Sequence, residues 1–533
     1  MDYMDYDVGG AIREGHTCLG IKLGSTRISA TLIGTDCKPI ASGSHAWESR
    51  LEDGVWTYSL DDVWAGLEVC FARLSTDVLS KYGVSPLTTV GCISVSAMMH
   101  GYLPLDREGS PLTPLRTWRN TFTEKAAKRL SEAFQFNIPQ RWSIAHLYQA
   151  ILNGEEHIHE IARLTTLAGY VHERLTGHNV LGVGDASGMF PVSGLDYDAG
   201  MLDAFDHLVA SRNLSWKLPD LLPRVLGAGA DAGSLTEEGA RLLDIKGNLQ
   251  PGIPFCPPEG DLGIGMVAAN SLAERTGNVS AGTSVYVSAV LERPLSKPHP
   301  EIEILSTPEG KPAAMLYCNN CTADLDAWIS LFHEVIEITG ATVRPSALYD
   351  VFYAKALEGD TDGGGLLSYN YVSGEPLVGM NQGRPLLARL PDSHLTLANF
   401  ARSILYSSVA TLRMGMDAFA LEQIQVDRMI GHGGLFKTED VGLRVMSMAL
   451  DLPVSLLSTA SAGDAWGGAL LAAYHSQKTS GETLQEFLSR CVFTDVTCKR
   501  VSPNPDDLAS FAAYMERFKQ GLEIERSAAE HLL

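Results

Sequence analysis

Two short turns, each rich in glycine and hydroxyl residues and each next to residues typical of β-strands, lie far apart in this chain. The first turn is Gly24-Ser25-Thr26 and the second is Gly282-Thr283-Ser284. Glycine lets a backbone approach a phosphate closely, and successive N–H groups and hydroxyls can then bind the phosphate oxygens. The pair of turns therefore predicts a nucleotide clamped between two lobes.

The length and charge of the chain limit the classes of protein it can belong to. Its 533 residues predict more than one domain, and a hydrophobic fraction of 45% predicts well-buried cores. A formal net charge of −22 argues against a nucleic-acid-binding protein, which needs a basic face. Backbone dipoles can still bind an anionic ligand locally.

The nine cysteines are odd in number and scattered, so they do not form a disulfide framework. Cys318 and Cys321 form a lone CxxC pair, whereas a zinc site would need further ligands. The acidic N-terminus does not have the apolar core of a signal peptide, and no apolar run reaches the ~20 residues that span a bilayer. We expect a cytoplasmic protein with no membrane partner.

Alternating β-prone and amphipathic helical segments predict an α/β fold with two lobes. The N-terminal residues 1–16 are expected to be flexible, and the Pro- and Gly-rich stretch 251–265 marks the boundary between the lobes. Expected strands lie at 18–21, 27–33, 38–45, 89–95, 278–292 and 427–430, with a hairpin-like pair at 103–105 and 109–114. Expected helices lie at 60–81, 122–135, 144–152, 156–176, 322–339, 395–423 and 437–450, with a loop-rich insert at 358–391.

Several polar groups in the first half could act on a small polar substrate. Asp261 lies in a Pro- and Gly-rich loop; such carboxylates are usually solvated, but one placed between glycine-rich elements could accept a proton from an attacking hydroxyl. Met99 and His100 follow a predicted buried strand and either enter a cleft or belong to the core. Trp118 and Asn120 suit a sugar face, although Trp118 could equally be a surface residue. The segment 136–142 also mixes aromatic and polar groups, but a plain inter-helix loop is the simpler interpretation.

Other nucleotide motifs are weaker. The chain has no Walker A pattern, and Gly263-Ile264-Gly265 is only half of a dinucleotide fingerprint. The run Gly431-His432-Gly433-Gly434 after an apolar strand is better placed, with an ordinary tight turn as the alternative.

Taken together, these blocks resemble the FGGY carbohydrate kinases from about residue 17 to about residue 520. The blocks that carry the resemblance are 20–26, 96–101, 175–177, 259–261, 281–284, 431–434 and 461–472. The resemblance implies two actin-like (ribonuclease H-like) lobes with a central cleft, a sugar-binding lobe at 17–262 and an ATP-binding lobe at 263–533.

The resemblance also implies roles for single residues. Asp261 would be the general base. Met99, His100, Trp118 and Asn120 would bind the sugar. ATP would be bound through Gly24, Ser25, Thr26, Gly282, Thr283, Ser284, Gly433 and Gly434, with Mg²⁺ as its usual companion.

Two positions depart from the family pattern. Lys22 stands in the first strand where the family usually has a carboxylate that helps to hold the metal's water shell, so metal use is open and the metal ligands are not assigned. Asn120 stands where pentulose kinases tend to have Asp, and its amide adds a donor that alters sugar preference.

The expected function is ATP-dependent phosphorylation of a small sugar, above all a ketopentose such as xylulose or ribulose. A kinase for another polyol or sugar acid is an alternative. Lys22 favours a second alternative, a kinase-like sugar or nucleotide sensor with weakened turnover. A third, an actin-like ATPase acting on a protein, is disfavoured by Met99 and His100. The expected partner is a small-molecule sugar, and a homodimer is possible.

Overall fold

The computed structural model of the chain describes residues 7–532, without the side chains of Ser461 and Asp464. Its elements form two compact units. The first unit comprises residues 1–272, 304–313 and 461–496, and the second comprises 273–303, 314–460 and 497–533. The chain thus enters the first unit three times, whereas the predicted lobes, 17–262 and 263–533, are each one continuous segment.

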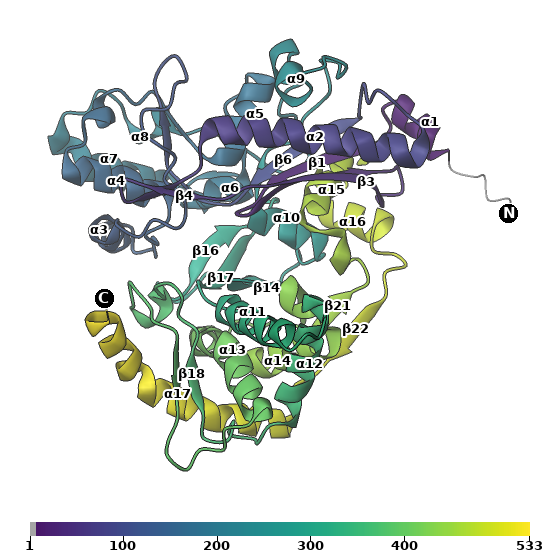
Figure 1. The fold of residues 1–533 in the computed structure, drawn as a ribbon. Coiled ribbons are helices and arrows are strands. Elements are labelled where there is room, and N and C mark those ends of the chain that lie inside the picture. The colour runs from purple at the N-terminus through teal and green to yellow at the C-terminus, as the bar shows by residue number, and fades with distance from the viewer. Residues whose placement is uncertain (1–6, 533) are drawn as a thin grey trace. The chain divides into compact units, whose positions relative to one another are not determined.

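Figure 1 shows the helices and strands of both units. The N-terminal part of the first unit contains α1 (Val8–Arg13), β1 (Cys18–Leu23), β2 (Arg27–Ile33), β3 (Pro39–Ala46), β4 (Arg50–Glu52), β5 (Val55–Thr57), α2 (Leu60–Tyr82), β6 (Cys92–Ala97), β7 (Leu103–Leu105), α3 (Glu124–Phe134), α4 (Ser143–Asn153), η1 (Glu156–His159), β8 (Arg163–Thr165) and α5 (Leu167–Thr176). It continues with β9 (Val180–Gly182), α6 (Val183–Ser187), β10 (Val192–Ser193), β11 (Asp196–Tyr197), α7 (Ala199–Val209), η2 (Ala210–Arg212), α8 (Leu218–Leu221), β12 (Arg224–Leu226), α9 (Glu237–Leu243), β13 (Glu259–Gly260) and α10 (Asp261–Ala268). Its C-terminal helices are α15 (Asp464–Gln477) and α16 (Leu484–Cys491).

The second unit contains β14 (Thr276–Ala281), β15 (Val285–Val290), α11 (Ala323–Ile338), α12 (Pro345–Glu358), β18 (Leu367–Tyr369), η3 (Pro376–Val378), β19 (Leu386–Ala388), α13 (Leu397–Leu421), β20 (Arg428–His432), η4 (Gly434–Lys437), α14 (Glu439–Leu450), β21 (Val454–Leu457), β22 (Cys498–Val501) and α17 (Pro505–His531). Three elements lie where the chain passes between the units: β16 (Glu303–Ser306), β17 (Pro312–Cys318) and η5 (Ala460–Ala462).

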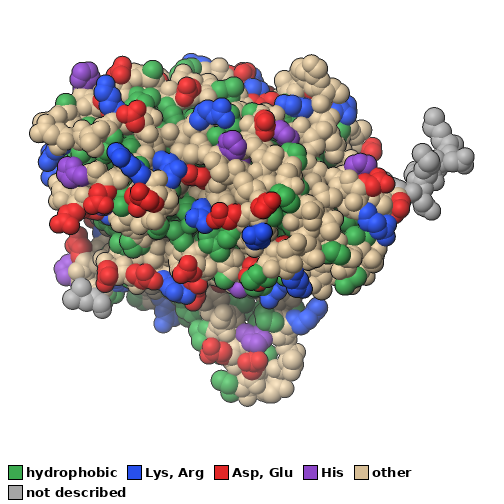
Figure 2. Space-filling view, turned by 90° about the horizontal axis from the view of Figure 1, so that it is seen from above, with side chains coloured by type: hydrophobic (Ala, Val, Ile, Leu, Met, Phe, Trp, Pro, Cys, Tyr) green, Lys and Arg blue, Asp and Glu red, His purple; other side chains and the backbone are tan. Residues whose placement is uncertain are grey.

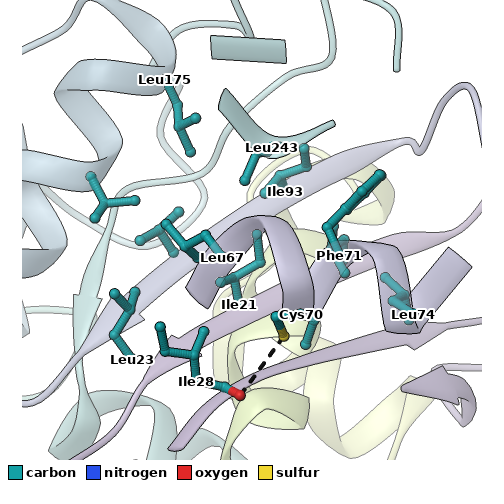
Figure 3. Close-up of a cluster of buried hydrophobic side chains, with 14 of the residues drawn as sticks. Ile21, Leu23, Ile28, Leu67, Cys70, Phe71, Leu74, Ile93, Leu175 and Leu243 are labelled. Atoms are coloured by element: carbon teal, nitrogen blue, oxygen red, sulfur yellow. Dashed lines mark hydrogen bonds between the residues drawn. The ribbon is translucent and has the colours of Figure 1, made fainter. Parts of the chain in front are cut away.

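The first unit is organised around a five-stranded sheet with the strand order β13-β6-β1-β2-β3. Strands β13, β6 and β1 run parallel, and β2 and β3 follow as antiparallel neighbours. Alternate residues of β1 and β2 face helix α2, where Ile21, Leu23 and Ile28 pack with Leu67 and Phe71 (Figure 3). Burying each such side chain stabilises the fold by about 1.5–3 kcal/mol, and the carboxyl ends of the parallel strands are thereby fixed in place.

The other face of this sheet lies directly against helix α15. A Cβ atom at Gly20 of β1 would lie 2.1 Å from the carbonyl oxygen of Ala465. One at Gly467 would lie 2.1 Å from the carbonyl oxygen of Ile264 in α10. Both glycines are therefore needed for backbone-to-backbone packing, which brings a late segment of the chain next to β1 and α10.

The second unit is built on a larger sheet. Its seven strands have the order β16-β17-β15-β14-β20-β21-β22. Strands β14, β20 and β21 are parallel neighbours, whereas β15 and β22 pair antiparallel to them. Parallel neighbours place their carboxyl ends at the same edge of a sheet. The turns that follow β14 and β20 are therefore adjacent.

The predicted α/β fold is confirmed, and the sequence located its strongest elements well. Helix α2 and strands β1–β3 lie where periodicity predicts them. The helix expected over 156–176 is wrong, because that stretch contains η1, strand β8 and the shorter helix α5. Strand β8 pairs with β7, so 103–105 forms its ladder with 163–165. The expected hairpin-like partner also contacts β7, through the bridge between Leu105 and Pro111 and a hydrogen bond from the N–H of Leu112 to the carbonyl oxygen of Pro104 at 2.9 Å. Long-range pairing of this kind is invisible to local patterns.

The flexible start expected over 1–16 is corrected in part. Residues 8–13 form α1, which Asp7 caps by accepting a hydrogen bond from the N–H of Gly10, and Ile12 of α1 is buried in the first core. Residues 1–6 lie outside the described part of the chain. The expected cleft between the two lobes stays a prediction.

The surface of the described residues carries charged side chains of both signs (Figure 2). Acidic and basic side chains are interspersed over the face shown in Figure 2. Within residues 7–532, no helix combines the length and the apolar character needed to cross a bilayer.

Candidate functional site

The first candidate site lies where strands β6 and β13 end side by side. Glu259 pairs with Ser96, and Gly260 pairs with Ala97. Met99 and His100 follow β6, and Asp261 follows β13 as the first residue of α10. The sheet thus brings three of the predicted site residues, Met99, His100 and Asp261, to one edge.

His100 is held in an unusual backbone conformation. Its φ angle is +66°, a left-handed value uncommon for residues other than glycine. Its Nδ1 lies 3.0 Å from the carbonyl oxygen of Gly188, which can only accept, so Nδ1 carries the proton and Nε2 keeps an acceptor lone pair. Burial, together with the charge of Arg141, holds the pKa of His100 well below its usual range. His100 is therefore neutral at pH 7 and suited to accept a hydrogen bond from a hydroxyl.

Trp142 packs beside His100. Its indole is fully buried and stacks on the imidazole, with ring centroids 6.1 Å apart and planes inclined by 20°. The neighbouring Ser143 donates a hydrogen bond to the carbonyl oxygen of Gly101. The segment 136–142, for which a plain loop is the simpler interpretation, therefore supplies an aromatic side chain against a predicted site residue.

Met99 is packed between two glycines. A Cβ atom at Gly260 would lie 2.3 Å from Met99 Cγ, and one at Gly188 would lie 2.9 Å from Met99 Cε. Only glycine fits at these two positions while Met99 keeps its place. The thioether is thereby held at the junction of β6, β13 and α6.

The side chain of Asn120 bonds to the backbone of two other residues. Its Oδ1 accepts a hydrogen bond from the N–H of Trp56 at 2.8 Å. Its Nδ2 donates to the carbonyl oxygens of Trp56 at 2.8 Å and Thr117 at 3.0 Å. An amide can pair with a backbone peptide in this donor-and-acceptor manner, whereas a carboxylate cannot. The neighbouring Trp118 is partly buried against the first core. Sugar contacts by these two residues stay predictions.

The first glycine-hydroxyl turn, Gly24-Ser25-Thr26, is fastened by its carbonyl oxygens. Trp47 donates its indole N–H to Gly24 O at 2.6 Å, and Tyr58 donates its hydroxyl to Ser25 O at 2.7 Å. The backbone N–H of Trp47 donates to Thr26 O at 3.1 Å. The turn therefore has a defined shape, with the hydroxyl of Thr26 on an exposed residue.

The second unit brings the two other predicted phosphate elements together. Gly282 follows β14, and a Cβ atom there would meet nothing within 4 Å. Gly433 follows the parallel strand β20 with φ +99°, and a Cβ atom there would lie 2.5 Å from the carbonyl oxygen of Ala281. Thr322 fixes the turn at Gly282 by donating its backbone N–H and its hydroxyl to Gly282 O, each at 3.0 Å. The open space above Gly282, between exposed Thr283 and half-buried Ser284, fits an anionic group such as a phosphate.

Lys22 lies on the same sheet face as Glu259. It pairs with Ser96 across β1 and β6, and Ser96 in turn pairs with Glu259. Paired residues point to the same side of a sheet, so Lys22 and Glu259 share one face, two strands apart. Among the described residues, no group of three His, Cys, Asp or Glu side chains is arranged to hold a metal ion.

The sequence did not identify two acidic residues at this site as functional candidates. Asp185 in α6 and Glu259 in β13 are both buried. Burial, with a smaller contribution from the charge of Asp261, raises the pKa of Asp185 to about 7. Burial and, after it, the charge of Asp185 raise the pKa of Glu259 to about 8. The signal for Glu259 was its place in Glu259-Gly260-Asp261; nothing in the local sequence of Asp185 indicates its burial.

Solved structures of sugar kinases share this architecture. The ligand-bound xylulose kinase from Lactobacillus acidophilus superposes with a TM-score of 0.76 at 15% identity, covering 97% of this chain and 100% of that one. The gluconate kinase from the same organism gives a TM-score of 0.74 at 16% identity, covering 97% and 98%. The fold is thus that of the actin-like (ribonuclease H-like) sugar phosphotransferases.

Family models then give the particular group. The N-terminal domain of the FGGY family of carbohydrate kinases matches residues 17–267, and its C-terminal domain matches residues 277–476. The chain belongs to the FGGY family of carbohydrate kinases. It is also 22% identical over 445 residues to the xylulose kinase of Haemophilus influenzae, covering 80% of this chain and 83% of that protein.

Proposed function

We propose that the chain phosphorylates a ketopentose such as xylulose or ribulose, with ATP as the phosphoryl donor and Asp261 as the general base. The observation that carries the proposal is the meeting of Met99, His100 and Asp261 at the ends of parallel strands β6 and β13. Similarity to proteins named xylulose kinase supports the ketopentose class. The gluconate kinase neighbour makes a sugar acid the alternative substrate.

Each residue of the first site has its own proposed role. Neutral His100 accepts a hydrogen bond from a sugar hydroxyl, and buried Trp142 keeps the imidazole in place. The oxygen of the attacking sugar hydroxyl bonds to the terminal phosphorus of ATP while the bond from that phosphorus to ADP breaks. Asp261 takes the proton of this hydroxyl. A positioned base of this kind contributes about 10²–10⁴ in rate.

Backbone N–H groups and hydroxyls of the turns at Gly24, Gly282 and Gly433 are suited to hold the phosphates. Mg²⁺ would supply charge neutralisation to the phosphates, and such ions are usually bound by one or two carboxylates plus phosphate oxygens. Asp261 is a carboxylate at the site that fits such a role, whereas the ammonium group of Lys22 could pair only with the phosphates.

The test is a screen for ADP release over ketoses, polyols and aldonic acids. We expect a ketopentose to give the highest kcat/KM. A sugar acid as the best substrate would replace the ketopentose assignment. The position of Lys22 favours a sensor with weakened turnover as the second candidate; sugar binding by calorimetry without ADP release from any compound would support it.

A further inference from the structure

Residues 319–322, between β17 and α11, hold the turn that follows β14. The backbone N–H and the hydroxyl of Thr322 both donate to the carbonyl oxygen of Gly282, each at 3.0 Å. The backbone N–H of Cys321 donates to the carbonyl oxygen of Thr283 at 2.8 Å. Two successive carbonyl groups of the turn are therefore directed at residues 319–322, which we call the bridge.

The direction of these two carbonyl groups also determines the direction of two N–H groups. Both peptide bonds are trans, and the C=O and N–H bonds of a trans peptide point in opposite directions. The N–H groups of Thr283 and Ser284 therefore point away from the bridge. Consecutive N–H groups of this kind form an anion-binding concavity, and the space at Gly282 is open.

The bridge is attached in turn to the segment 370–375, which connects β18 to η3. The Nδ2 of Asn319 donates to the carbonyl oxygen of Gly374 at 2.7 Å. From the other side, the Nδ2 of Asn370 donates to the carbonyl oxygen of Cys321 at 2.9 Å. The bridge thus binds the turn through one set of hydrogen bonds and the segment 370–375 through another.

Asn320 and Glu375 form the buried centre of this attachment. The Oε2 of Glu375 accepts hydrogen bonds from the Nδ2 of Asn320 at 3.1 Å and from its backbone N–H at 3.3 Å. The Oδ1 of Asn320 accepts hydrogen bonds from the backbone N–H of Ser373 at 3.0 Å and from its hydroxyl at 3.2 Å. The amide of Asn320 is therefore bonded at both ends, which gives the bridge one defined position.

We infer that Asn320 and Glu375 are positioning residues for the binding of ATP, an inference that rests on the proposed function. By holding the bridge, they fix the peptide groups of the turn at Gly282, whose N–H groups bind phosphate. A turn that already presents these groups loses less conformational freedom when the nucleotide binds. Both side chains act through the bridge and the turn, and their role needs no contact with ATP.

The test compares the Kd for ATP with the Kd for adenosine, which has no phosphate, by calorimetry in the parent and in variants. Asn320→Leu removes both ends of the amide, so the Kd for ATP should rise about 10-fold while the Kd for adenosine stays unchanged. Asn320→Asp/Glu375→Gln exchanges the amide and the carboxyl group between the two positions and keeps a hydrogen bond between them. This double variant should have the parental Kd for ATP. Asn381→Asp, at an exposed position near the same segment, is the control and should change neither Kd.

A milder variant keeps the inference testable if Asn320→Leu does not fold. Thr322→Val keeps the shape of the side chain and removes only its hydroxyl, while the backbone bond to Gly282 remains. The Kd for ATP should then rise by about 2- to 10-fold, again without a change for adenosine.

The possible outcomes have distinct meanings. An unchanged Kd for ATP in Asn320→Leu and Thr322→Val would overturn the inference, and so would equal losses of ATP and adenosine binding. A loss of ATP affinity that persists in the double variant would overturn the role of the pair. A parent that binds ATP but phosphorylates no sugar would overturn the proposed function and leave the positioning role in place. A parent that binds no ATP would overturn both.

Discussion

The Nδ1 atom of His100 lies 3.0 Å from the carbonyl oxygen of Gly188. This contact joins the segment after β6 to the segment after α6 and determines which ring nitrogen of His100 carries the proton. It also explains how a buried histidine keeps a left-handed backbone conformation, because stacking on Trp142 holds the ring from the other side.

His100→Asn should therefore weaken sugar binding. Asparagine tolerates a positive φ angle, so the backbone can keep its conformation, but the imidazole acceptor is lost. One net hydrogen bond of about 0.5–1.5 kcal/mol corresponds to a rise of about 2- to 10-fold in the sugar Kd. Calorimetry measures this change, with His207→Asn at an exposed position as the control. An unchanged Kd would remove His100 from the sugar site.

Two glycines of the second unit should respond differently to substitution. Gly282→Val adds a side chain in open space, so the thermal unfolding temperature should stay close to that of the parent, while the Kd for ATP should rise. Gly433→Ala forces a Cβ atom to within 2.5 Å of a carbonyl oxygen at φ +99°, so it should destabilise the fold by about 1–3 kcal/mol. Unfolding and nucleotide titrations of both variants check the contrast. Equal ATP affinity in Gly282→Val and the parent would show that phosphate does not approach this turn.

Asn120→Asp restores the residue type expected in pentulose kinases, yet it should destabilise this chain. A carboxylate would face the carbonyl oxygens of Trp56 and Thr117, which now accept hydrogen bonds from the amide. Leaving such acceptors unpaired costs about 1–3 kcal/mol. Urea unfolding measures the loss, with Asn248→Asp as a comparison at a more exposed amide. An Asn120→Asp variant as stable as the parent and with higher ketopentose affinity would instead support a direct sugar contact.

Lys22→Asp tests the proposed use of Mg²⁺ by this chain. Two unit charges about 4 Å apart interact by about 4 kcal/mol at an effective dielectric constant near 20, and the sign reverses between lysine and aspartate. We expect the variant to need less Mg²⁺ at fixed ATP and sugar without loss of turnover. Lys38→Asp, at an exposed lysine, controls for net charge. Lower activity together with a higher Mg²⁺ requirement would identify Lys22 as a phosphate ligand.

The sequence predicted the parts of this molecule that local patterns determine. Amphipathic α2 and the apolar strands β1, β2 and β6 lie as expected, because their periodicity reflects one buried face. The functional roles expected for the glycine-rich turns and for Asp261 stay predictions. Gly20 and Gly467 have a packing role: because they have no side chains, β1 and α10 can contact α15.

Features that depend on distant pairing could not be predicted. The return of residues 461–496 to the first unit, the pairing of β7 with β8, and the stacking of Trp142 on His100 all join segments far apart in the chain. The buried state of Asp185 also depends on Thr166 and on β13 rather than on its own neighbours in sequence. The hydrogen bond between Asn120 and Trp56 likewise appears only in three dimensions, and the sugar-binding role of Asn120 stays a prediction.

The central claim is that Asp261 is the base for phosphoryl transfer to a sugar hydroxyl. The most direct measurement is sugar phosphate formed in a single turnover by the parent and by Asp261→Asn, with the preferred ketopentose and saturating ATP. The account predicts a rate about 10²–10⁴ lower in the variant, with the sugar Kd nearly unchanged. A variant that forms sugar phosphate within about tenfold of the parental rate would contradict it.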